Sequence, residues 1–161
     1  MDERSPYAAP ASEVEVFEER KGAPWKGIVL GLLTDIGGSI VLSTLIVTVI
    51  AMIMTSHGVD QNEMRTLVLG PERSLFITAA LYGTGLLFSV LGGFVCARIV
   101  KQSELKWGAV MAVLSTLIGL AMGGNHEGTA LTFTLYVASI VATIAGAWLG
   151  MKRNQRQRSR A

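Results

Sequence analysis

Four long apolar segments dominate the chain, at about 27–54, 74–100, 107–122 and 129–151. Half of all residues are hydrophobic and only 16% are charged, whereas a soluble domain has about a quarter of its residues charged. Backbone groups cannot stay unpaired in lipid, so segments that cross the hydrocarbon core are expected to be helices. The sequence therefore predicts an all-α integral membrane protein, a bundle of four transmembrane helices in residues 25–151.

The lysines and arginines are distributed very unevenly between the two sides of such a bundle. Twelve of the 14 lie in the N-terminal region, in the turn around 101–106 or in the C-terminal tail. Only Arg65 and Arg73 lie in the loops on the opposite side. Positive residues are retained on the cytoplasmic side of membranes, so we expect both termini in the cytoplasm.

The segments that flank the spans are polar. Residues 1–24 are acidic and rich in proline and alanine, which predicts a disordered cytoplasmic tail. The basic tail, 152–161, directly follows the last span, and we expect its cations to contact anionic lipids: Lys152, Arg153 and Arg156. No aromatic or folded nucleic-acid module accompanies this charge, so nucleic acid is not expected as a partner. The segment 64–69, MRTLVL, is predicted to form a short interfacial helix.

Small residues recur at four-residue spacing on every predicted span. Such stripes let helices approach closely in lipid, where packing and hydrogen bonds drive association. Cys96, in the second span, is interpreted as a small packing residue. The glycines expected at helix contacts are Gly27, Gly31, Gly85, Gly93, Gly119 and Gly146.

Asp35 lies within GIVLGLLTDIGGSIVLSTLI, near the middle of the first span. A charged residue at this depth costs about 2.5–3.5 kcal/mol on insertion scales, which the surrounding Leu, Ile and Val residues can offset. Ser39 and Ser43 follow at four-residue spacing on the same helical face. No cation lies deep in any span, so the expected partners of Asp35 are hydroxyl groups or trapped water, from among Ser39, Thr84, Ser89, Ser115, Thr116 and Thr143.

Two roles for Asp35 remain open from the sequence. The first is structural, in which a protonated carboxyl ties helices of the bundle, or of a partner or second copy, together. The second is that of a titrating group in a small proton-coupled transporter that acts as an oligomer. The chain contains no convincing catalytic set, and no enzyme activity or cofactor is expected. The loop residues His57, Asp60, Glu63, His126 and Glu127 match no metal-binding motif.

Residues 75–119 resemble a family of small, uncharacterised four-span bacterial membrane proteins. The resemblance is carried by FSVLGGFVCARI at the end of the second span, by ELKWGAVMA at the entry to the third, and by GLLTDIGGS in the first. It implies a four-helix protein of the bacterial inner membrane and supplies no activity. GLLTDIGGS is also loosely similar to the acidic segment of small multidrug-resistance transporters, which have glutamate there and lack the long first outer loop of this chain.

Overall fold

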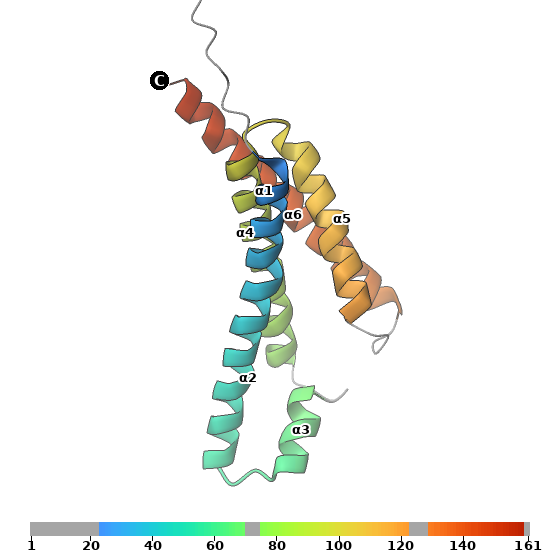
Figure 1. Cartoon of the computed structure of the whole chain (residues 1–161). Helices are drawn as coiled ribbons and strands as arrows, with labels where there is room; N and C mark the ends of the chain where they lie inside the picture. Colours follow the sequence, from blue (N-terminus) through green and yellow to red (C-terminus); the bar gives the residue numbers. More distant parts are fainter. Residues whose placement is uncertain (1–22, 70–74, 123–128, 160–161) are drawn as a thin grey trace, which may run out of the picture.

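The computed structural model describes residues 23–69, 75–122 and 129–159, and these residues form helices joined by short turns (Figure 1). Four of the helices are long and apolar enough to cross a membrane. The predicted all-α bundle of a multi-pass membrane protein is therefore confirmed. Most of the predicted N-terminal tail lies outside the described residues, as do His126 and Glu127.

Three of the four spans are longer than their apolar segments suggested. The first is one continuous helix, Pro24–Ser56, composed of α1 (Pro24–Leu32), η1 (Leu33–Gly37) and α2 (Gly38–Ser56). The others are α4 (Leu75–Val100), α5 (Glu104–Met122) and α6 (Thr129–Arg158). The third span begins three residues earlier than the apolar run, and α6 continues through most of the predicted basic tail. Polar residues can extend a helix beyond the hydrocarbon core, so apolar length alone underestimates helix length.

One end of the bundle carries most of the basic side chains, and we call it the basic end. It contains the start of α1, the turn between α4 and α5, and the C-terminal part of α6 (Figure 1). Pro24 occupies the first turn of α1, where its missing N–H costs no helical hydrogen bond. Lys26 lies 5.6 Å from the ring of Trp25, and Lys152 lies 5.0 Å from the ring of Trp148. Aromatic and cationic pairs of this kind are typical of a membrane–water interface.

The helices pack closely toward the basic end because glycines bring their backbones together. Gly93 of α4 faces the Thr143 carbonyl, and Gly146 of α6 faces the Val90 carbonyl, so α4 and α6 touch directly. An added Cβ at Gly27 would lie 3.1 Å from the Cys96 carbonyl oxygen. At Gly31 a Cβ would lie 2.9 Å from the Gly92 carbonyl oxygen. Four of the six glycines expected at helix contacts therefore lie against a neighbouring backbone.

The other two glycines expected at helix contacts have more space around them. An added Cβ at Gly85 would meet nothing within 4 Å, and one at Gly119 would make an ordinary contact of 3.5 Å with Tyr136. Gly85 therefore does not make the expected helix contact, whereas Gly119 does contact α6, although through a side chain and not through the backbone. The four-residue spacing identifies a helical face, but it does not show at what depth a second helix touches that face.

The bundle opens toward its other end. Figure 1 shows α5 and α6 diverging from α2, while the short helix α3 (Gln61–Leu69) follows the far end of α2. No residue of α2 is buried. The α3 helix matches the predicted helix at 64–69 and begins three residues before it. The described bundle is therefore closed at the basic end and splayed at the end that carries α3, which we call the α3 end.

Replacing Gly93 by alanine should destabilise the bundle, because the new methyl group would collide with the Thr143 carbonyl of α6. Overpacking of this kind costs about 1–3 kcal/mol. Thermal unfolding in detergent, followed by circular dichroism, would measure the loss. Gly83→Ala on the same helix is the matched control, since a Cβ there meets nothing within 4 Å. Equal stability of the two variants would contradict the close approach of α4 and α6.

Candidate functional site

Asp35 lies in η1, a single π-helical turn that interrupts the first span. A π turn pairs residues five apart, and such turns occur frequently at functional sites. The Ser39 hydroxyl donates to the Asp35 backbone carbonyl at 2.6 Å, a local bond that accompanies bends in helices. Because the π turn rotates the residues that follow it, the register differs from that of the straight helix assumed from the spacing. Ser43 is half-buried and does not line the site.

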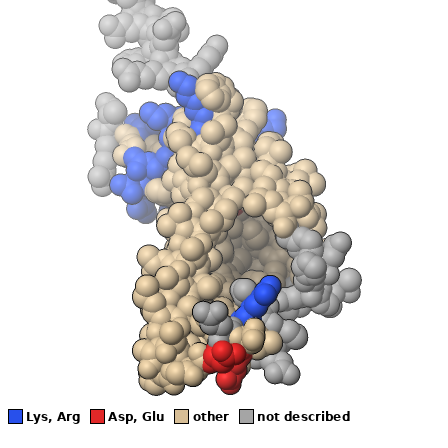
Figure 2. Space-filling model, turned by 60° about the horizontal axis from the view of Figure 1, so that its bottom comes forward, with Lys and Arg blue, Asp and Glu red and all other residues tan. Residues whose placement is uncertain are grey.

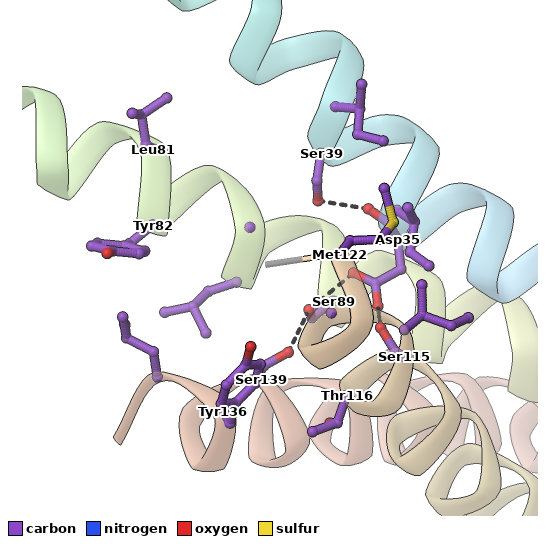
Figure 3. A pocket seen from close by; sticks show the side chains of 17 residues that line it. Asp35, Ser39, Leu81, Tyr82, Ser89, Ser115, Thr116, Met122, Tyr136 and Ser139 are labelled. Carbon is purple, nitrogen blue, oxygen red and sulfur yellow. Dashed lines mark hydrogen bonds between the residues drawn. The ribbon is translucent and has the colours of Figure 1, made fainter. Parts of the chain in front are cut away.

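The carboxyl group of Asp35 receives a hydroxyl on each oxygen. The Ser115 hydroxyl of α5 donates to Oδ2 at 2.6 Å, and the Ser89 hydroxyl of α4 donates to Oδ1 at 3.0 Å (Figure 3). Asp35 and Ser89 are each only 4% exposed. In a low-dielectric interior an unpaired carboxyl would be costly, and these two bonds satisfy it without a cation.

A further hydrogen bond brings in the fourth span. The hydroxyl of Ser89 lies 3.0 Å from the hydroxyl of Ser139 on α6. Asp35, Ser89, Ser115 and Ser139 therefore form one chain of polar groups with a member from every span (Figure 3). We call these four residues the polar network. It lies at the level where the close-packed part of the bundle gives way to the splayed part.

The polar network forms part of the wall of a cavity of about 320 Å³. Figure 2, which brings the α3 end forward, shows the molecule hollowed on this side. All four spans supply the remaining wall, and it is mainly apolar. The other lining residues are Ile36, Ser39, Ile40, Leu81, Tyr82, Gly85, Leu86, Thr116, Ile118, Gly119, Met122, Leu135 and Tyr136.

The structure distinguishes among the hydroxyl partners that were expected for Asp35. Ser89 and Ser115 contact its carboxyl group. Thr84, Thr116 and Thr143 instead donate to backbone carbonyls four residues earlier in their own helices. A helical threonine readily bonds to its own backbone in this way, so its presence in a span does not identify a tertiary contact.

Ser139 was missed by the sequence reasoning, which did not include it among the expected hydroxyl partners of Asp35. The signal that could have found it is weak, since a single serine in a membrane helix usually bonds to its own backbone.

A second polar cluster, at the basic end, was also missed. Asn154 is buried, and its side-chain amide donates to the Ala97 carbonyl at 2.9 Å and to Glu104 Oε1 at 3.4 Å. Arg158 donates to the carbonyl of Lys101, which has a positive φ of 57° in the turn between α4 and α5. Asn154 continues the four-residue series of Gly146 and Gly150, and this spacing was the available signal. The cluster fastens the end of α6 to that turn.

The remaining predicted residues lie away from the cavity. Lys152, Arg153 and Arg156 are exposed on α6 at the basic end. In the loop after α2, the Nδ1 atom of His57 is 2.8 Å from the Ile53 carbonyl. Among the described residues, no group of three or more histidine, cysteine or acidic side chains is placed to hold a metal ion. Cys96 is fully buried against Val100 and Met111.

Comparisons with protein-family models, with curated proteins and with solved structures gave no match for this chain. The arguments about function therefore depend on the geometry of the chain itself.

Replacing Ser89 by alanine should lower the free energy of unfolding, because it removes one donor to Asp35 and breaks the link to Ser139. Hydrogen bonds between membrane helices contribute about 0.6–1.7 kcal/mol each. Ser43→Ala is the control, as Ser43 lies outside the polar network, and we expect a change below about 0.5 kcal/mol. Unfolding in mixed micelles would measure both. A Ser89→Ala variant as stable as the control would contradict the network's contribution.

Proposed function

We propose that this chain is a non-enzymatic membrane protein, a structural or accessory component whose four spans are joined at Asp35. One observation carries the proposal: the two carboxyl oxygens of Asp35 accept hydroxyls from two different helices, and Ser89 extends the connection to a third. Asp35 and Ser89 are buried, Ser115 and Ser139 are half-buried, and all four side chains are short, so little conformational entropy opposes the network. Such a joint fixes the bundle while leaving the exposed surfaces of the spans available to lipid, a partner protein or a second copy.

The proposed setting is a bacterial inner membrane with both termini in the cytoplasm. The uneven distribution of lysine and arginine supports this orientation. The exposed cations Lys152, Arg153 and Arg156 would then face anionic lipid headgroups, each contributing about 1 kcal/mol.

Single-cysteine labelling on intact bacterial cells tests the orientation. We expect a membrane-impermeant maleimide to label Asn62→Cys at the α3 end and not Ser159→Cys at the basic end, both of which are exposed positions. The unmodified chain, with only the buried Cys96, is the background control. Labelling of Ser159→Cys but not of Asn62→Cys would show the opposite orientation and contradict the proposal.

A second candidate function is that of a small proton-coupled transporter, with Asp35 as its titrating group. The cavity favours it, since a purely structural joint needs no hollow of about 320 Å³ beside the carboxyl. The other ionisable side chains that line the cavity are Tyr82 from α4 and Tyr136 from α6, and α2 and α5 contribute none. Asp35 is therefore the one carboxyl group among the cavity-lining residues, and this candidate function assigns the exchanged proton to it.

Asp35→Asn distinguishes the two candidates when it is compared with Asp35→Ala. The amide still accepts one hydroxyl and donates to the other, so a structural joint should retain most of its stability in the asparagine variant. Alanine leaves both serines without this partner and should cost about 1–3 kcal/mol. The measurement is thermal unfolding in lipid nanodiscs. Equal stability of wild type and Asp35→Ala would contradict the structural proposal.

Infrared absorption of the Asp35 carboxyl in the same nanodiscs supplies the other half of the comparison. A transporter requires a band that is lost on ionisation near neutral pH and is absent from Asp35→Asn. A band that is unchanged across the physiological range would exclude proton exchange at this site and leave the structural role.

A further inference from the structure

The cavity beside Asp35 combines a carboxyl group with walls that are mostly apolar, and we propose that it binds a hydrophobic organic cation. Asp35 is the only carboxyl group among the cavity-lining residues, and none of them is a lysine, arginine or histidine. An ionised Asp35 would keep its negative charge while Ser89 and Ser115 donate to it, because a neutral hydroxyl donor transfers no proton. Each carboxylate oxygen also has a second lone pair that can face a ligand. Charge complementarity therefore selects a cation over an anion.

The walls select the rest of the ligand. Leu81, Leu86 and Ile118 are apolar, and Tyr82 and Tyr136 present aromatic rings from two helices. Tyrosine rings attract organic cations through their faces, most strongly where water is excluded. A hydrated metal ion would find only one carboxyl group here, since the other oxygen-bearing side chains of the lining are hydroxyls. An amine or quaternary ammonium with an aromatic or aliphatic body matches both the acid and the walls. The volume of about 320 Å³ is within the range of small-molecule pockets.

Access is available at the side where the helices separate. The cavity lies between the closed basic end and the splayed α3 end, and Figure 2 shows the molecule hollowed when the α3 end is brought forward. Gly85 contributes to the space, since its absent side chain leaves nothing within 4 Å of the Cβ position.

This inference depends on the site of the second candidate function and does not require transport. The probe is benzyltrimethylammonium, and the matched control ligand is neopentylbenzene, its uncharged isostere with carbon in place of nitrogen. Isothermal titration of the full chain in nanodiscs, with empty nanodiscs subtracted, measures both. We expect wild type to bind the cation, and to bind it more tightly than the isostere.

Two variants make the test specific. Asp35→Asn should weaken cation binding by about tenfold or more, the ratio expected when a charged contact is lost. Gly85→Leu should abolish binding by filling the cavity while it leaves the polar network in place. Gly83→Leu is its control, because Gly83 is equally unhindered and lies outside the cavity lining.

The results of this binding test can be separated from those that test the proposed functions. Retained binding in Gly83→Leu with loss in Gly85→Leu supports the site even if Asp35→Asn fails to assemble. The inference is overturned if wild type binds no cation, as would happen if a lipid acyl chain occupied the cavity. It is also overturned if the isostere binds as tightly as the cation, or if Gly85→Leu binds the cation like wild type. A stable Asp35→Asn protein with undiminished cation binding would also overturn it, while leaving the structural role of Asp35 intact.

Discussion

An acid placed inside a membrane helix must have its oxygens satisfied by the protein, and this constraint organises the bundle around Asp35. Here the partners are uncharged, because hydroxyls of Ser89 and Ser115 donate to the two carboxyl oxygens. Lipid offers no alternative partner, so these helices can separate only by exposing polar groups. The Ser89–Ser139 contact extends the same constraint to α6.

The polar network also marks a change in how the helices pack. Toward the basic end, glycines such as Gly93 and Gly146 bring backbones into direct contact, and Asn154 fastens α6 to the end of α4. Toward the α3 end, Gly85 faces open space, and α2 contributes no buried residue. A bundle closed at one end and open at the other leaves its acid at the inner end of a hollow. The structural role and the binding role of Asp35 therefore belong to the same geometry.

The π turn at Leu33–Gly37 connects local structure to this geometry. An α-helix of ideal register would place Gly27, Gly31, Asp35, Ser39 and Ser43 along one face, as the spacing implies. With the π turn, Gly27 and Gly31 contact α4 while Ser39 lines the cavity and Ser43 lies outside it. Because of this local change in register, one part of the predicted face packs against α4 and the next part lines the cavity.

The sequence by itself determined the all-helical membrane architecture, because apolar runs of this length have few other ways to pair their backbone groups in lipid. It also identified Asp35, since a carboxyl group within an apolar segment is unusual and needs a partner. It included Ser89 and Ser115 among the candidate partners. Only the tertiary structure decided which hydroxyls reach that carboxyl and that Ser139 joins them. It also decided that Gly85 and Gly119 line a cavity, whereas Gly93 and Gly146 make close backbone contacts. Helical periodicity fixes the face on which a residue lies, whereas the depth and angle at which helices meet depend on packing summed over all four spans.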